Sequence, residues 1–308
     1  MGMMPSPYGT QLPYEEKDTK VVGTNPKERP DAVDKVTGRA RYAADINLPG
    51  QLIGKVLRSP HAHANIKSID TSAAEALDGV KAVVTSADFP DQPVLHASGG
   101  EIMINFRDVT RNMMAREKAL YDGHPVAAVA ATSESIAKAA MKLIKVDYEV
   151  LPHVIEVVAA MAEDAPLLNE EQFTRGIEPA PEKPSNIAAR MVTKLGDAEA
   201  GFKAADLVIE REFDTKAAHQ GYIEPHASIA NYTEGGNAEV WTSTQGHYMN
   251  RAQTAKVLEM DMSKIKVMPA EIGGGFGGKN LIYLEPLAIR LSQKSQRPVK
   301  MAMTRDEV

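Results

Sequence analysis

A run of glycines in the segment 271–280 (EIGGGFGGKN) restricts the backbone of this chain more than any other part of the sequence. Glycine reaches positive φ values and lets the backbone approach another group closely. The run follows a predicted strand at 264–268 and precedes a predicted helix at 282–294. Backbone N–H groups in such a loop are free to bind an anion. A loop of this kind can therefore hold a ligand.

Two nucleotide-binding patterns fit the same run. Gly273, Gly275 and Gly278 satisfy G-x-G-x-x-G, and residues 273–279 satisfy most of a P-loop. Each pattern lacks a part, because Asn280 stands where the P-loop needs Ser or Thr, and one strand–helix unit does not make a dinucleotide-binding sheet. A glycine-rich turn without a ligand is the third interpretation, and all three stay open on the residues alone.

The rest of the chain alternates between strand and helix patterns, which predicts an α+β fold. Residues 1–30 carry five prolines and are predicted to form an extended arm. Residues 31–155 are predicted to form an α/β domain, and residues 156–188, rich in Pro, Glu and Asn, a linker. Residues 189–308 are predicted to form a second domain. Strands are predicted at 50–57, 80–85, 126–131, 146–150, 207–213, 238–244, 264–268 and 297–303, and helices at 133–145, 250–260 and 282–294.

Composition excludes several classes of function. The chain has no cysteine, so it holds no disulfide, no thiolate-bound iron–sulfur cluster and no cysteine nucleophile. The formal net charge is -6 and no basic stripe is present, which argues against nucleic-acid binding. No apolar run approaches the roughly 18 residues needed to cross a bilayer. These features favour a cytoplasmic protein with no membrane partner.

Several segments resemble one enzyme family in the same order. GGGFGGK (273–279) resembles the molybdopterin-site motif of the xanthine dehydrogenase and aldehyde oxidase family of molybdenum hydroxylases. The other matching segments are DKVTGRARYAA (34–44), RSPHAHA (58–64), DGHPVAAVAA (122–131), IEPH (223–226) and WTSTQ (241–245). The resemblance implies a hammerhead-type domain over 31–155 and the first part of a molybdopterin-binding domain, incomplete at its carboxyl terminus, over 189–308.

The resemblance also implies a cofactor and its binding residues. In this family the dithiolene of a pterin holds molybdenum, so a chain without cysteine can carry it. Gln245 corresponds to a glutamine that donates a hydrogen bond to an oxo ligand of the metal. The loop beside the metal and its pterin corresponds to Gly274, Gly275, Phe276, Gly277 and Gly278. Phe276 also fits a place in the hydrophobic core, and that alternative stays open.

The same resemblance bears on the substrate. His226 of IEPH is predicted to line the substrate pocket. Xanthine-type members carry a glutamate directly after GGGFGGK that contacts the purine, whereas Asn280 stands here and puts a purine substrate in doubt. The glutamate base of the family lies beyond the segment that this chain spans. No catalytic base and no protein metal ligand is therefore expected among these residues.

The expected function is that of the amino-terminal portion of a molybdenum subunit in an oxidoreductase complex. The reaction would be a hydroxylation with oxygen from water, or a reductive variant of it, on an aromatic, heterocyclic, aldehyde or CoA-thioester compound. Iron–sulfur clusters and FAD are expected only on partner chains, and a further chain or segment would supply the rest of the molybdenum subunit. The isolated chain is expected to be inactive. A nucleotide-binding enzyme and a non-catalytic folded fragment are the alternatives.

Overall fold

The structure, a computed structural model, describes residues 29–98 and 103–308. The chain divides into two compact units, Met1–Ala40 and Arg41–Val308. The described residues of the first unit include one short helix, α1 (Ala32–Val36). The arm predicted at the amino terminus lies almost entirely outside the described residues. Every other element named below belongs to the second unit.

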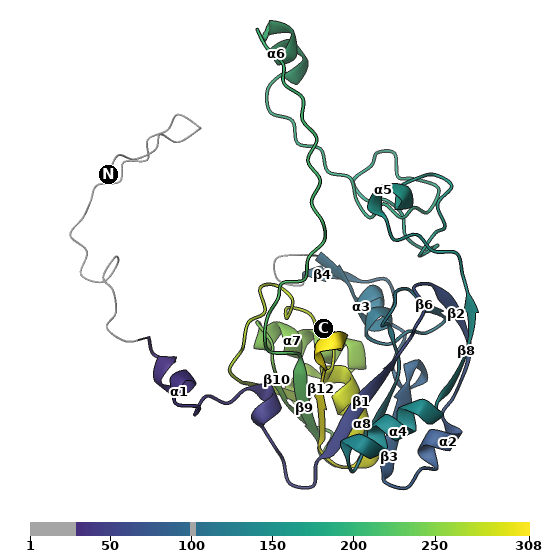
Figure 1. Cartoon of the computed structure of the whole chain (residues 1–308), viewed down its shortest axis with the longest axis vertical. Coiled ribbons are helices and arrows are strands. Elements are labelled where there is room, and N and C mark those ends of the chain that lie inside the picture. Colours follow the sequence, from purple (N-terminus) through teal and green to yellow (C-terminus); the bar gives the residue numbers. More distant parts are fainter. Residues whose placement is uncertain (1–28, 99–102) are drawn as a thin grey trace, which may run out of the picture. The chain divides into compact units, whose positions relative to one another are not determined.

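Seven strands of the second unit form one mixed sheet (Figure 1). In sheet order they are β11 (Ile265–Pro269), β10 (Ala238–Thr242), β9 (Ala227–Tyr232), β12 (Val299–Ala302), β1 (Leu52–Arg58), β7 (Pro125–Ala131) and β3 (Val80–Thr85). Neighbouring strands are antiparallel except for two parallel pairs, β10 with β11 and β1 with β12. The two predicted domains therefore contribute strands to the same sheet.

Two smaller sheets, seven α-helices and four short 3-10 helices (Ala43–Asp45, Ser86–Asp88, Met262–Lys264 and Arg305–Glu307) complete the described part of the second unit. One sheet has the order β6 (Lys118–Ala119), β2 (Ala64–Asp70), β8 (Lys145–Val150), and the other pairs β4 (His96–Ser98) with β5 (Met103–Asn105). The helices are α2 (Ser72–Glu75), α3 (Phe106–Met113), α4 (Glu134–Leu143), α5 (Val157–Ala160), α6 (Ala198–Ala204), α7 (His247–Leu258) and α8 (Glu285–Ser295). The predicted α+β class is confirmed. Within the described ranges no helix has both the length and the apolar character to cross a membrane.

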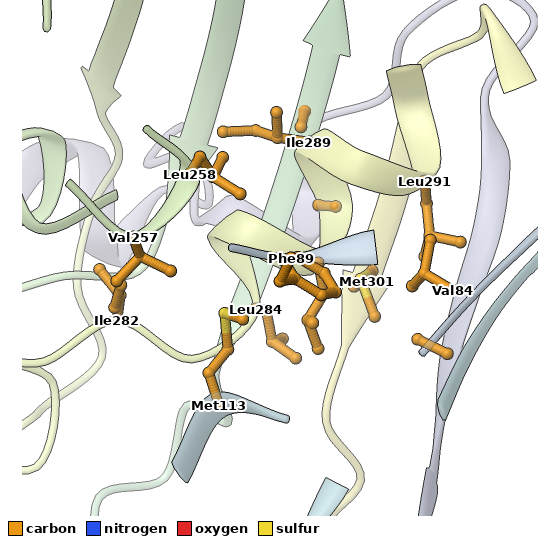
Figure 2. Close-up of a cluster of buried hydrophobic side chains, with 14 of the residues drawn as sticks. Val84, Phe89, Met113, Val257, Leu258, Ile282, Leu284, Ile289, Leu291 and Met301 are labelled. Carbon is orange, nitrogen blue, oxygen red and sulfur yellow. The ribbon is translucent and has the colours of Figure 1, made fainter. Parts of the chain in front are cut away.

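Strand β7 lies between β1 and β3 and is buried along its whole length. Successive side chains of a strand point to opposite faces, and Ala128 and Val129 accordingly pack into two different hydrophobic clusters. Helix α8 contributes to the first cluster and α4 to the second. Figure 2 shows the first cluster, in which Leu291 of α8 lies with Val84 of β3 and Met301 of β12. The sheet therefore has a helix on each face.

The strand order brings several loops to one edge of the sheet. Strands β10 and β11 are parallel, so the segments that follow them start at the same edge. Strand β9 is antiparallel to both β10 and β12, so β9 begins at this edge and the segment that precedes β9 ends there. Strand β1 is parallel to β12, so the segments that follow these two strands also start at this edge. In sheets of this kind ligands bind beyond the carboxyl ends of the parallel strands.

The prediction of a strand at 207–213 is wrong, because these residues lie in neither a helix nor a strand. The predicted alternation of apolar side chains is present, but a strand also needs a neighbour to pair with. No backbone–backbone hydrogen bond joins residues 206–218 to the rest of the described chain. Leu207 is 76% exposed, Ile209 66% and Phe213 87%. The apolar side chains of this segment are therefore largely uncovered by the other described residues.

The segment predicted as a linker, 156–188, has little regular structure beyond α5. It is held by side-chain contacts instead, since Asn186 Nδ2 donates to the carbonyl oxygens of Ala160 and Pro166 at 3.0 Å each. Its place as a boundary between two domains stays a prediction.

Candidate functional site

The glycine loop after β11 adopts the backbone that its composition predicts. Gly274 has φ +95° and Gly277 has φ +93°, values that favour glycine. Phe276 lies between them with φ +48°, which is unusual for a residue with a side chain. The residue is 71% exposed, so the alternative of a core position is wrong. The loop therefore presents an aromatic side chain outward at the edge of the sheet.

Gln245 lies directly against this loop. It follows β10, whereas the loop follows β11, and the parallel pairing of these strands brings the two segments together. Gln245 Oε1 accepts hydrogen bonds from the backbone N–H groups of Gly277 at 2.9 Å and Lys279 at 3.2 Å. Backbone N–H groups can pair only with the oxygen of a carboxamide, which fixes the orientation of the amide. Gln245 Nε2 has no partner among the described residues and is free to donate.

Gly275 makes this contact possible because it has no side chain. A Cβ atom built there would lie 2.5 Å from Gln245 Oε1 and 2.8 Å from its Cδ. The backbone N–H groups of Gly274, Gly275 and Phe276 have no hydrogen-bond partner in the described part of the chain. Together with Gln245 Nε2 they form a set of donors at one place. Such a set suits a ligand that is rich in acceptor atoms.

A buried ion pair behind the loop was not predicted from the sequence. Lys279 Nζ lies 2.8 Å from Glu224 Oε2, with 0% of the lysine side chain and 10% of the glutamate side chain exposed. The two residues are 55 positions apart, and nothing in the residue pattern joins them. The P-loop interpretation needs this lysine at a phosphate. Because its ammonium group is buried against a carboxylate, the structure argues against a P-loop.

A cavity of about 400 Å³ lies beside the loop and includes Gly278 in its wall. His226, predicted to line a substrate pocket, is among its lining residues, as are Tyr222 and Tyr283. Asn280, the second residue predicted for that pocket, is exposed and does not line the cavity. The structure thus brings His226 and the loop together but leaves Asn280 outside the cavity.

His226 is a neutral side chain in this setting. Burial, and after it the charge of Lys279, lowers the pKa of His226 to about 4. Its Nε2 atom lies 2.9 Å from the hydroxyl oxygen of Tyr222, whose ring also lies 4.9 Å from Lys279 Nζ. The tyrosine therefore contacts the histidine in the cavity wall and the lysine behind the loop.

Glu285, the acidic residue that follows the loop in sequence, has a structural role. Its Oε1 atom accepts from Thr242 Oγ1 at 2.6 Å and Asn250 Nδ2 at 2.8 Å, and its Oε2 atom accepts from the Tyr283 N–H at 2.9 Å. The side chain is buried with both oxygens engaged, which does not suit a general base. Among the described residues, no group of three or more His, Cys, Asp or Glu side chains is arranged to hold a metal.

Two family models match the chain. One is the aldehyde oxidase and xanthine dehydrogenase a/b hammerhead domain, over residues 37–152, and the other is the molybdopterin cofactor-binding domain, over residues 179–308. The first match lies within the predicted domain 31–155, and the second includes the predicted domain 189–308 and part of the predicted linker. The second match contains the Gln245 and glycine-loop segments.

Several curated proteins and solved structures are similar. A probable hypoxanthine oxidase of Escherichia coli (strain K12) is 35% identical over 96% of this chain and 33% of its own length. The nicotinate dehydrogenase large molybdopterin subunit of Eubacterium barkeri is 32% identical over 94% of this chain and 63% of its own length. Quinoline 2-oxidoreductase from Pseudomonas putida 86 matches with a TM-score of 0.75 and 30% identity, over 91% of this chain and 34% of its own. The chain thus spans about a third of the first of these relatives and of the solved structure.

Proposed function

This chain belongs to the xanthine dehydrogenase and aldehyde oxidase family of molybdenum hydroxylases, and from that premise we propose that it forms part of the molybdenum-cofactor subunit of an oxidoreductase complex. The observation that carries the proposal is the contact between Gln245 and the glycine loop. It leaves one carboxamide N–H₂ group and three backbone N–H groups without partners among the described residues, at one edge of the sheet.

These donors fit the molybdenum cofactor. A molybdopterin cofactor presents oxygen and sulfur acceptors, and it brings its own metal ligands. The absence of a cluster of metal-binding side chains among the described residues is therefore no obstacle. The space at Gly277 also fits, since nothing lies within 4 Å of a Cβ built there, whereas the space at Gly275 is filled by Gln245. The loop can approach a bulky group closely.

We assign a binding role to each hydrogen-bond donor at this edge of the sheet. Gln245 Nε2 donates a hydrogen bond to an oxygen ligand of the cofactor, and an amide does so without changing its protonation state with pH. The N–H groups of Gly274, Gly275 and Phe276 supply fixed dipoles beside it. When bound, the cofactor supplies redox chemistry at a carbon centre with oxygen taken from water. The catalytic base is assigned to a part of the subunit that this chain does not span.

We place the substrate in the cavity beside the loop. Tyr222, Tyr283 and His226 supply aromatic walls, which favours a planar aromatic or heterocyclic compound. The neutral imidazole of His226 can share a hydrogen bond with such a compound without bringing a charge into the cavity. Asn280 lies outside this cavity and is not assigned a contact with substrate.

The complex would need other polypeptides. The chain has no cysteine, so we assign iron–sulfur clusters and FAD to partner chains. The exposed apolar segment 207–213 lacks a neighbouring strand in the described part of the chain, which supports a further chain or segment that supplies the rest of the molybdenum subunit. Without that part, we expect the isolated chain to be inactive. A reducing cytoplasm is the compartment that suits this composition.

Metal and cofactor analysis of the complex tests the proposal. The tagged chain would be purified from its native cell together with bound partners, and molybdenum, iron, pterin and flavin would be measured. We expect one molybdenum and one pterin per copy of the chain. A complex with partners but without molybdenum would contradict the proposal. Recovery of the chain without molybdenum but with a bound nucleotide would favour the dinucleotide interpretation, and recovery with neither would favour a non-catalytic fragment.

A further inference from the structure

Lys279 connects the glycine loop to two other segments through three kinds of contact. Its side-chain ammonium pairs with Glu224 at 2.8 Å, in the segment before β9. Its backbone N–H donates to Gln245 Oε1 at 3.2 Å, and its backbone carbonyl accepts from the Gln245 N–H at 3.0 Å. One residue therefore fixes the end of the loop to Glu224 and holds the carboxamide of Gln245 in place.

Glu224 holds the start of the same loop. Its Oε2 atom accepts from the backbone N–H of Gly273 at 2.7 Å, in addition to the ammonium of Lys279. A single carboxylate oxygen thus fixes both ends of the segment 273–279. The ring of Tyr222 completes the arrangement, since it lies 4.9 Å from Lys279 Nζ and would be 2.7 Å from a Cβ built at Gly278.

Stability alone does not account for this pair. Removing two charges from water costs several kcal/mol, and a neutral pair of similar volume is often equally stable. The other oxygen, Glu224 Oε1, is buried without a partner among the described residues, which adds to the cost. A buried pair of this kind is better suited to holding one geometry than to raising the free energy of unfolding.

We propose that the Glu224–Lys279 ion pair positions the glycine loop and Gln245 for the cofactor. This role rests on the function proposed above and assigns both side chains as positioning residues, not as groups that touch the cofactor. The pair fixes both ends of the loop, the loop holds Gln245 Oε1, and the free Nε2 atom therefore points in one direction. Losing the pair would let the loop and the donor set move while the sheet beneath stays folded.

The deciding variant removes both charges at once. Single variants such as Lys279→Met leave one buried charge unpaired, which is strongly destabilising, so they are poor tests. In Glu224→Gln/Lys279→Met the carboxamide oxygen of residue 224 can still accept from the Gly273 N–H. Lys294→Met is the matched control, because Lys294 forms an ion pair with Asp88 at 2.9 Å in another part of the unit.

Four properties would be measured: the melting temperature, the molybdenum content and the Mo(V) resonance signal of the purified complex, and amide hydrogen exchange in the cofactor-free chain. We expect the double variant to melt within a few degrees of the wild type. We expect its molybdenum content to fall by about tenfold, as when outer-shell partners of a bound metal are removed, and its Mo(V) resonance signal to change. In the cofactor-free chain, the amides of Gly277 and Lys279 should exchange hydrogen faster. Lys294→Met should leave the molybdenum content, the resonance signal and these amides unchanged.

The outcomes separate this inference from the proposed function. A double variant with wild-type molybdenum content, resonance signal and amide exchange would overturn the positioning role and leave the proposed function standing. A wild-type complex without molybdenum would overturn the proposed function itself. If the double variant does not fold, Glu224→Asp decides, because it keeps the charge and shortens the side chain. Unchanged molybdenum content and amide exchange in Glu224→Asp would also overturn the positioning role.

Discussion

At the level of single residues, the site depends on side chains that are absent as much as on those present. Gln245 can fold onto the loop only because Gly275 leaves its space empty. The orientation of its amide follows from two backbone donors, Gly277 and Lys279. The orientation of Gln245, which donates to the proposed cofactor, is thus fixed by Gly277 and Lys279, which do not themselves donate to the cofactor.

Replacing Gly275 by alanine tests this dependence. The new Cβ would lie 2.5 Å from Gln245 Oε1, so the carboxamide must leave its two backbone donors. Because Gln245 is exposed and its side chain is flexible, we expect a loss of stability of only about 1 kcal/mol but a loss of most bound molybdenum. Thermal unfolding and metal analysis would measure both effects.

Gly246→Ala is the matched control for that experiment. A Cβ at this neighbouring glycine would meet its nearest atom, Met249 Cβ, at 3.6 Å, an ordinary contact. We expect it to keep wild-type molybdenum content. Equal metal content in Gly275→Ala and Gly246→Ala would show that the position of the Gln245 carboxamide does not matter for binding.

At the level of elements, the pairing of β1 with β12 joins the two halves of the sheet. The pairing is tight at Gly54, where a Cβ would lie 2.6 Å from Met301 Cγ and 3.1 Å from Val299 Cγ1. Met301 is 1% exposed and belongs to the main hydrophobic cluster. The glycine in β1 is therefore required by the packing of the β12 side chains, and not by an unusual φ value.

We expect Gly54→Ala to lower the free energy of unfolding by about 1–3 kcal/mol, the usual cost of overpacking a core. Met301→Ala should also destabilise the chain, because it leaves a cavity. In the double variant the new methyl group occupies part of that cavity, so the two effects should be less than additive by about 1 kcal/mol. Urea denaturation of the four proteins measures this, and strict additivity would contradict the close approach at Gly54.

At the level of the whole molecule, two buried histidines make stability depend on pH. Burial lowers the pKa of His124 and of His226 to about 4. His124 is also fixed as a neutral ring, because Nδ1 accepts from the Leu120 N–H at 3.1 Å and Nε2 faces the Arg111 carbonyl oxygen at 2.8 Å. In the unfolded chain a histidine has a pKa near 6.5. The unfolded chain therefore binds more protons between pH 6.5 and 4.

The contribution of the two neutral histidines to the free energy of unfolding should therefore be complete above pH 6.5. It should be lost progressively as the pH falls toward 4. Each histidine contributes on the order of 3 kcal/mol to this loss. Urea denaturation at pH 7.5, 6 and 5 would show it, and His124→Asn should reduce the slope. His153, which is exposed, provides a control in His153→Asn. A stability that does not change between pH 7.5 and 5 would contradict the burial of both rings.

Local elements of this fold were predictable, and their long-range pairing was not. The predicted strand at 80–85 agrees with β3, and the predicted helix at 133–145 agrees closely with α4, since caps and side-chain periodicity are local signals. The strand at 207–213 failed because pairing depends on a neighbour that periodicity does not supply.

The same limit applies to the site. Resemblance placed Gln245 and the loop in one site, and the structure brings them into contact, while their binding of the cofactor stays a prediction. The Glu224–Lys279 pair was not predictable, because it depends on the antiparallel order of β9 and β10 and the parallel order of β10 and β11.

The shared sheet also sets the order of events during synthesis on the ribosome. Leu52 of β1 pairs with Val299 of β12. The ribosome must therefore add about 250 further residues after β1 before the parallel neighbour of β1 has been synthesised. At about 5–20 residues per second, that interval is on the order of tens of seconds. During that time one edge of β1 is open to chaperones or to other nascent chains. The contact between β1 and β12, which joins the two halves of the sheet, can therefore form only after residues 59–298 have been made.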